Sequence, residues 1–393
     1  MIAELAAAAL AFAPTATPGV TSTTIALGGT APLSGPAAAF GSVARGSDAY
    51  FRYVNSRGGV HGRKIVYTYL DDGYEPARTV ALTQQLVEQN HVFALFDTIG
   101  TDNALAVRAY VNQQKIPDLF VGSGVSKIAA DHAKFPWMMG YLPSFVGEGA
   151  MDGRRLAKTT PQAKIGVLYE DSDFGKDLLA GLKRGLRGKA TIASAQSYEP
   201  IDRDVDSQIV RLHAAHADTL MLFTTPLYAI KGYADANRIG WRPRIYVSSV
   251  AISPDIIKIA RLAATPREVD GSISIAFVKD PTSPVWRNDK TVRRYRSIVA
   301  RFLPGAKPLD VYLYYGMAVA YTMVDTLKHA GTNPTRDSLL RAATHLNEVN
   351  PFLLPGIRIT TSPSDYYPMK KARFVRYRNG LWVLFGKLVD ARP

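Results

Sequence analysis

The sequence predicts an α/β fold composed of two doubly wound lobes with mainly parallel central sheets. The chain has 393 residues, which is enough for two or three domains with sizeable cores. From Thr24 onward, short apolar runs alternate with amphipathic stretches, and this is the pattern of repeated βαβ units. The pattern completes one unit by Val121 and starts again at Lys164, so two lobes are expected.

The first unit begins with an apolar strand that leads into the Gly- and Pro-rich turn Ala31–Pro36. The second strand ends in Asp71 and Asp72. Neighbouring strand residues point to opposite faces, so we expect these acids to shape a turn rather than act as a pair. The predicted strands of this unit are 23–29, 65–70, 92–98 and 118–121, and the predicted helices are 42–56, 75–89 and 104–115.

The second unit repeats this rhythm, and segment 135–141, which contains Pro136 and Gly140, is predicted to carry a hinge before it. Its Asn379-Gly380 pair favours positive φ angles and predicts a hairpin at the C-terminal end. The predicted strands are 164–169, 190–197, 218–224, 244–250, 272–277, 373–377 and 382–389, and the predicted helices are 174–186, 205–213, 228–238, 255–262, 285–302, 312–330 and 336–346.

Composition and missing motifs exclude several classes of protein. The chain has no cysteine, which removes disulfides, thiolate metal sites and cysteine nucleophiles. Its net charge is +14, but the basic residues are spread along the chain, so we expect a solvated basic surface and no nucleic-acid partner. Glycine fingerprints for nucleotides, zinc-binding helix motifs and nucleophile elbows are missing. The sequence therefore predicts a protein that is not an enzyme and needs no cofactor.

Residues 1–21 are predicted to be the remnant of a secretory signal. The apolar run Leu5–Ala13 is too short to span a bilayer, and Ala11-Phe12-Ala13 fits a small-x-small cleavage site. The basic segment that normally precedes such a run is missing, and a misplaced start codon would explain this. An Ala-rich N-terminal helix is the alternative.

Polar, glycine-rich turns follow several of the predicted strands. Ligands of open parallel sheets bind beyond the carboxyl ends of the strands. Exposed N–H groups in such turns bind a carboxylate without a buried counter-charge. Each turn taken alone also fits a helix N-cap, and Asp102 in particular resembles one. Their recurrence in both units favours a shared cleft; the turns are Ser34-Gly35, Gly100–Asn103, Gly122–Ser126, Thr224-Thr225 and Ser248-Ser249.

Motifs at 31–36, 55–65, 71–72, 171–177, 206–209, 354–357 and 361–367 occur together in one order and spacing. With these motifs the chain resembles the type I periplasmic binding proteins of branched-chain amino acid ABC transporters, from about residue 22 to 389. The resemblance implies two lobes joined by three hinge segments, formed by 22–141 plus 278–362 and by 142–277 plus 363–393. It further implies a monomer that is exported to the periplasm and delivers a small carboxylate ligand to an inner-membrane ABC permease.

The resemblance also implies a ligand site between the lobes. The turns at Gly100-Thr101 and Val125-Ser126 match those that hold the ligand carboxylate in the family. The second lobe contributes the loop from Thr225 to Tyr228. Aromatic side chains are expected to form the apolar walls, although ordinary core or hinge packing is the alternative for each of them. These aromatic residues are Phe40, Tyr141, Phe174 and Tyr228.

One departure from the family concerns the ligand's amino group. The family's amino-acid receptors pair the ligand ammonium with a glutamate, where this chain has Val247-Ser248-Ser249. An unpaired buried ammonium costs several kcal/mol. We therefore expect Ser249 to face an aromatic or aliphatic acid without an α-amino group. Two alternatives stay open: Asp102 could pair an ammonium and admit a branched-chain amino acid, or the lobes could form a ligand-sensing domain that acts through a regulatory partner.

Overall fold

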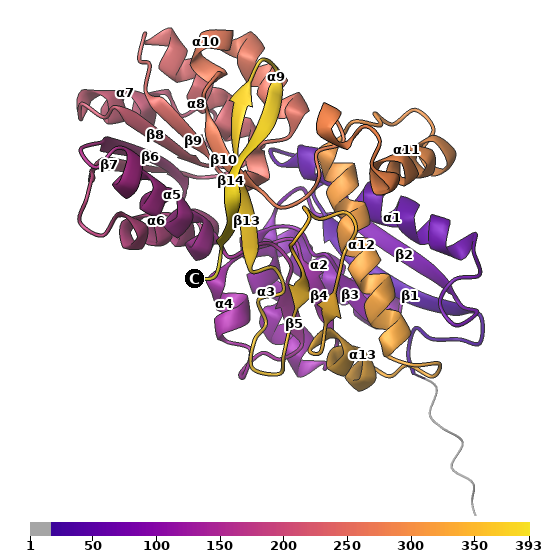
Figure 1. The fold of residues 1–393 in the computed structure, drawn as a ribbon. Helices are drawn as coiled ribbons and strands as arrows, with labels where there is room; N and C mark the ends of the chain where they lie inside the picture. Colours follow the sequence, from indigo (N-terminus) through magenta and orange to yellow (C-terminus); the bar gives the residue numbers. More distant parts are fainter. Residues whose placement is uncertain (1–16) are drawn as a thin grey trace, which may run out of the picture.

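The computed structural model describes residues 17–393, so the apolar run predicted as a signal, 5–13, lies outside the described residues. Two sheets organise the chain (Figure 1). The first has five parallel strands in the order β2-β1-β3-β4-β5, and the second has seven in the order β14-β13-β10-β9-β8-β6-β7. We call the parts around these sheets lobe 1 and lobe 2.

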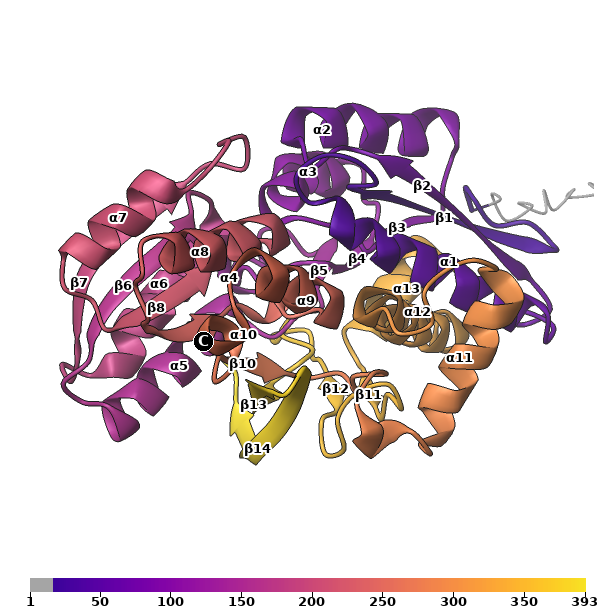
Figure 2. The same ribbon diagram turned by 90° about the horizontal axis from the view of Figure 1, so that it is seen from above.

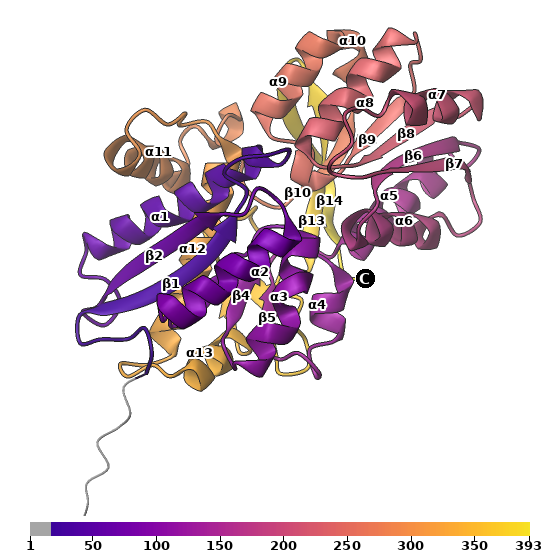
Figure 3. The same ribbon diagram turned by 180° about the vertical axis from the view of Figure 1, so that it is seen from behind.

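Lobe 1 has helices on both faces of its sheet. Helices α1 and α12 cover one face, whereas α2 and α3 pack together on the other, which Figure 3 shows from behind. Its strands are β1 (Thr24–Ala31), β2 (Lys64–Asp71), β3 (Ala94–Phe96), β4 (Asp118–Val121) and β5 (Met138–Gly140). Its helices are α1 (Gly41–Asn55), α2 (Pro76–Gln84), α3 (Thr101–Gln113), α4 (Ser126–Ala130), α11 (Lys290–Phe302), α12 (Val311–His329) and α13 (Arg336–Ala343), beside the short pair β11 (Asn347–Glu348) and β12 (Ile359–Thr360).

Lobe 2 is built in the same way and ends in an antiparallel hairpin. The hairpin turns at Asn379 and Gly380, whose φ angles of 50° and 84° are those that the sequence predicts. The strands are β6 (Lys164–Glu170), β7 (Thr191–Tyr198), β8 (Thr219–Phe223), β9 (Arg244–Val247), β10 (Ile273–Ala276), β13 (Lys371–Arg378) and β14 (Leu381–Asp390). The helices are α5 (Phe145–Thr159), α6 (Asp173–Leu186), α7 (Asp206–Ala214), α8 (Pro226–Arg238), α9 (Pro254–Ala263) and α10 (Pro266–Val269).

The chain passes between the two sheets three times: after β5, after β10 and before β13. Figure 2 shows the lobes side by side, with the β13–β14 hairpin next to their junction. The predicted α/β fold with two parallel central sheets is therefore confirmed, while the lobe boundaries at 141, 277 and 362 stay predictions. Within residues 17–393, no helix combines the length and hydropathy needed to cross a membrane.

Three elements differ from those predicted. Segment 135–141 is not only a hinge, because it contains β5, which pairs with β4 as the edge strand of lobe 1. Helix α5 was not predicted, because Gly147, Gly149 and Gly153 lower the helix propensity of its sequence. The helix predicted from residue 285 begins at Lys290, where the Asp289 side chain accepts hydrogen bonds from two backbone N–H groups of the first turn.

Close packing of α1 against α12 depends on two glycines. A Cβ atom on Gly46 would overlap the carbonyl oxygen of Leu313, and one on Gly316 would overlap that of Val43. The backbones of the two helices therefore approach as closely as their main-chain atoms allow. This contact fixes the position of α12 relative to α1. Helix α12 in turn places Tyr312 and Tyr315 at the junction of the lobes.

Replacing Gly316 with alanine should destabilise the protein even though alanine favours a helix by about 1 kcal/mol. The added methyl group must push α12 away from α1, and overpacking of this kind costs about 1–3 kcal/mol. Urea unfolding should therefore show a lower free energy of unfolding for Gly316→Ala. The exposed Arg45→Ala on α1 is the control and should unfold like the wild type. Equal stability of all three proteins would contradict the close approach.

Candidate functional site

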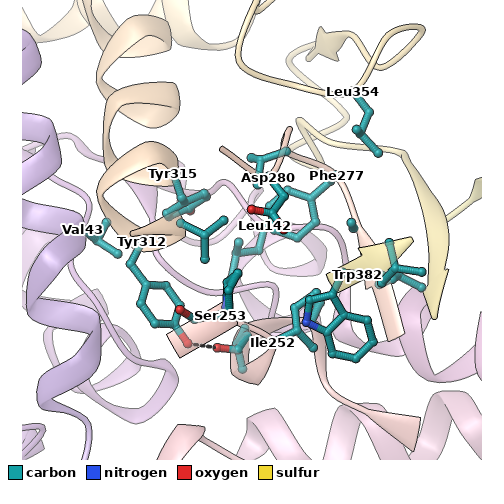
Figure 4. A pocket seen from close by; sticks show the side chains of 18 of the residues that line it. Val43, Leu142, Ile252, Ser253, Phe277, Asp280, Tyr312, Tyr315, Leu354 and Trp382 are labelled. Atoms are coloured by element: carbon teal, nitrogen blue, oxygen red, sulfur yellow. Dashed lines mark hydrogen bonds between the residues drawn. The ribbon is translucent and has the colours of Figure 1, made fainter. Parts of the chain in front are cut away.

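A cavity of about 580 Å³ lies where the carboxyl ends of the two sheets meet. Its walls are mostly apolar and come from both lobes and from the segment after β10. Figure 4 shows Val43, Tyr312 and Tyr315 on one side of the cavity and Trp382 on the other. We call the part bounded by Phe40, Gly100, Thr101, Phe174 and Thr225 the cleft arm, and the part bounded by Phe277, Arg373, Val375, Trp382 and Leu384 the hairpin arm.

The start of α3 forms the polar end of the cleft arm. Gly100 occupies the N-cap position with a φ angle of 110°, and Thr101 is the first helical residue. The first N–H groups of a helix have no acceptor inside it, so they attract anionic groups. The Thr101 hydroxyl is 2.8 Å from the Ser123 hydroxyl, which holds it in place.

Tyr74 covers this end of the cavity, and the sequence did not point to it. Its φ angle of 68° is rare for a residue with a side chain. A Cβ atom on Gly100 would lie 2.9 Å from Tyr74 Cε2 and 2.5 Å from Asn103 Oδ1. Only glycine therefore fits between the aromatic ring and the first turn of α3.

The lobe 2 hydroxyls that line the cleft arm are already hydrogen-bonded inside the protein. The Ser249 N–H and hydroxyl donate to the Glu148 carboxylate over 2.7 and 2.6 Å. Thr225 contacts Tyr198, whose phenol oxygen accepts the Thr225 N–H at 3.1 Å. Glu148 is fully buried behind the wall and does not line the cavity. Within the described part of the chain, this side of the cavity consequently presents no carboxylate that could pair a ligand ammonium.

Aromatic rings form much of the remaining wall. The Phe40 ring meets Tyr312 edge-on with ring centres 5.4 Å apart. Phe174 meets Phe145 in the same way at 4.8 Å. Edge-to-face pairs fix the orientation of both rings, so the walls are shaped before any ligand binds.

Six of the residues predicted from the sequence line this cavity: Phe40, Gly100, Thr101, Phe174, Thr225 and Ser249. Five others do not: Asp102, Val125, Ser126, Tyr141 and Tyr228. Tyr141 lies in the core of lobe 1, where its hydroxyl is 2.9 Å from that of Thr322. The Tyr228 hydroxyl donates to the backbone oxygens of Pro200 and Asp202, so its polar end faces away from the cleft.

The expected N-cap at Asp102 is wrong, because Gly100 holds that position and Asp102 is the second helical residue. The Asp102 carboxyl group lies beside Asp173 of lobe 2, and its partial burial there, together with the Asp173 charge, raises its pKa. Val125 is the N-cap residue of α4 and lies in the core.

Ser126 and Lys127 join the two lobes beside the cavity. The Ser126 N–H and hydroxyl donate to the Asp177 carboxylate of α6 at 2.6 and 3.0 Å. Lys127 Nζ lies 2.6 Å from Asp173 on the same helix. On another side of the cavity, the Tyr312 hydroxyl donates to the Val250 carbonyl oxygen at 2.8 Å. The lobes are therefore in a closed arrangement, in which Ser126 contacts α6 and does not line the cavity.

Residues of the hairpin arm were not foreseen either. Arg373 and Val375 occupy alternate positions of β13, so they share one face of the strand. The sequence predicted this strand, but its hydrophobic pattern does not say which face borders a cavity.

A family comparison settles the class of the chain. The sequence model of the periplasmic binding protein family matches residues 24–380. The chain belongs to the periplasmic binding protein family. Leu/Ile/Val-binding protein homolog 3 of Brucella melitensis is 25% identical over 207 residues, covering 50% of this chain and 53% of the relative. The chain thus spans about half of that relative, whereas homolog 2 of Brucella abortus is 24% identical over 84% of this chain and 86% of its own.

Solved structures share the fold of this periplasmic binding protein over nearly the whole chain. A fatty acid ABC transporter substrate-binding protein from Thermomonospora curvata has a TM-score of 0.80 at 21% identity, covering 96% of this chain and 95% of its own. A branched-chain amino acid ABC transporter protein from Thermus thermophilus with bound valine gives 0.83 at 17%, covering 94% and 97%. A solute-binding protein from R. palustris in complex with benzoate gives 0.77 at 18%, with the same coverage.

The closed arrangement should depend on the Asp177 carboxylate. Asp177→Ala removes two hydrogen bonds to a charged acceptor, each worth about 1.5–3 kcal/mol when well shielded and less at this half-buried position. Small-angle X-ray scattering should show a larger radius of gyration for the ligand-free variant. Lys176→Ala is the matched control, because Lys176 is exposed on the same helix and pairs within lobe 2 with Asp171. An unchanged radius for Asp177→Ala would contradict this role.

Glu148 should make stability depend on pH. Burial raises the pKa of Glu148 to about 7 in the folded protein, although the Ser249 hydrogen bonds oppose the shift. The unfolded chain, with a carboxyl pKa of 4.5, releases this proton earlier. The free energy of unfolding should therefore fall as pH rises from about 4.5 to about 7, by up to about 1.4 kcal/mol per pH unit for this group.

Glu148→Gln should lessen that slope, which urea unfolding between these pH values measures. Part of the slope should persist, because burial also raises the pKa of Glu170 to about 7. The exposed Glu199→Gln should keep the wild-type slope. The same slope in Glu148→Gln and the wild type would show that Glu148 does not carry this effect.

Proposed function

We propose that this protein is an extracytoplasmic solute receptor of an ABC importer that binds a carboxylate-bearing ligand between its lobes. The observation that carries the proposal is an apolar cavity with the start of α3 at one end, at the junction of two lobes. Such a cavity suits binding of a small molecule, since most of the ligand surface is buried and few polar groups fix its orientation. Membership of the periplasmic binding protein family supports the same conclusion.

The ligand carboxylate lies at the start of α3 in this proposal. The unpaired N–H groups of the first turn and the Thr101 hydroxyl are the donors. The Phe40 and Phe174 rings, from opposite lobes, then border the apolar part of the ligand. A ligand held in this way contacts both lobes and favours the closed arrangement through its higher affinity for that state.

The ligand has no α-amino group in this proposal. The hydroxyl of Ser249 donates to Glu148, and neither residue offers an ammonium a charged partner in the cavity. Asp280 is the acidic residue among those that line the cavity, and its Oδ1 atom already accepts two hydrogen bonds from Thr282. An ammonium beside Ser249 would lose its hydration, and Ser249 would offer it no counter-ion. Aromatic and aliphatic acids are therefore favoured over branched-chain amino acids.

Delivery of the ligand completes the proposed function. The receptor acts as a monomer in the periplasm and presents its closed, loaded form to an inner-membrane ABC permease. The sequence of the N-terminal segment, with its short apolar run, supports export.

A thermal-shift screen of the purified protein, freed of bound ligand, tests the proposal. A compound that binds only the folded state raises the melting temperature by mass action. Aromatic and aliphatic acids should raise it, whereas leucine, isoleucine and valine should not. Stabilisation by these amino acids alone would keep a receptor but contradict the missing amino group. Stabilisation by no acid or amino acid would contradict the proposed function.

Thr101→Ala should weaken binding of the best acid from this screen. The lost hydrogen bond to a charged acceptor is worth about 1.5–3 kcal/mol, which corresponds to roughly a tenfold to hundredfold rise in Kd. Isothermal titration calorimetry measures this change. Thr159→Ala, on the exposed surface of α5, is the control and should bind like the wild type. Equal affinity of Thr101→Ala and the wild type would exclude the start of α3 as the carboxylate site.

A further inference from the structure

Three residues that line the cavity each carry a buried polar atom that has no hydrogen-bond partner within residues 17–393. These atoms are Arg373 Nε, Trp382 Nε1 and the Tyr315 hydroxyl oxygen. The arginine and tryptophan nitrogens can only donate a hydrogen bond. Buried donors are nearly always satisfied, so three unpartnered ones in one cavity indicate that its occupant supplies acceptors.

Arg373 and Trp382 lie on one face of the β13–β14 hairpin. Arg373 pairs with Ala276 of β10 and with Leu388 of β14. Trp382 pairs with Tyr377, which lies four positions after Arg373 on β13. Four positions of a strand span roughly 13 Å. The hairpin arm therefore extends along the strands, away from the cleft, and offers donors at both of its ends.

The charges around the cavity single out Arg373. Among the described residues, 17–393, it is the one cationic side chain that lines the cavity. The lining also contains Asp280, but no ion pair joins the two within 4 Å in the part of the chain that the structure describes. Other residues of this arm, such as Phe277, Val375 and Leu384, are apolar. A guanidinium group in such surroundings gains most from an anionic partner.

We propose that the cavity binds an elongated acid with two anionic ends: one carboxylate at the start of α3 and the other at Arg373. The two groups are joined by an apolar chain that lies between Tyr315 and the hairpin, and α,ω-dicarboxylic acids are the ligand class with this chemistry. The inference rests on the proposed function and adds the second anionic group. A fatty acid with one carboxylate would leave either Arg373 or the first turn of α3 without an acceptor.

Matched pairs of monocarboxylic and α,ω-dicarboxylic acids, in a series of increasing chain length, test this inference by isothermal titration calorimetry. The wild type should bind the dicarboxylic acid about tenfold or more tightly than the monocarboxylic acid at the chain length that spans both arms. Arg373→Met should remove this advantage and leave the affinity for the monocarboxylic acid within about threefold.

Arg376→Met is the matched control. Arg376 lies on the same strand but on its other face, over the Phe385 ring, so the variant should keep the full preference for the dicarboxylic acid. Should Arg373→Met fail to fold, the chain-length series on the wild type still shows whether a second carboxylate on the ligand raises the affinity.

The outcomes separate this inference from the proposed function. Binding of monocarboxylic acids with no advantage for any dicarboxylic acid would overturn the second anionic site and leave the receptor function standing. A preference for dicarboxylic acids that persists in Arg373→Met would overturn the role of Arg373. Binding of no acid of either kind would overturn both proposals.

Discussion

Polar contacts between the lobes hold apolar surfaces together, and the cavity depends on them. Ser126 and Lys127 of lobe 1 bind two carboxylates of α6, and Tyr312 binds the backbone of Val250. Apart, the lobes would expose the rings of Phe40 and Phe174 to water. Hydrophobic burial favours closure without direction, whereas these hydrogen bonds set the register in which the two walls meet. The shape of the cavity is thus a property of the lobe pair.

Glycine serves this arrangement in two different ways. At the helix interface, Gly46 and Gly316 let the backbones of α1 and α12 touch, which sets where Tyr312 and Tyr315 enter the cavity. At Gly100, a positive φ angle turns the chain from β3 into α3, and the missing side chain leaves room for Tyr74. The first role is a matter of packing and the second of conformation. Both position side chains that a ligand would contact.

The sequence predicted the sheets and much of the cleft arm, because apolar runs and turn residues are local signals. Strand β4 and the turn at Asn379-Gly380 follow directly from such signals. Helix α5 escaped prediction because its glycines are explained only by distant contacts: Gly149 and Gly153 face α6, and Gly147 faces the backbone of Ala391. The hydrogen bond between Ser249 and Glu148 joins residues 101 positions apart, so no local sequence signal predicts it. The hydrogen bonds from Ser126 to Asp177 are likewise not predictable from local sequence, because Asp177 lies in the other lobe.

Unpartnered donors explain how a mostly apolar cavity could distinguish one ligand from another. Apolar walls discriminate weakly between molecules of similar size, since each extra methylene group contributes only about 1 kcal/mol. A buried donor that is left without an acceptor costs more binding free energy, and every ligand that lacks the matching acceptor bears this cost. Arg373 Nε, Trp382 Nε1 and the Tyr315 hydroxyl have no hydrogen-bond partner within residues 17–393. Selectivity in this cavity would therefore depend more on the donors that a ligand leaves without a hydrogen bond than on the apolar area that it covers.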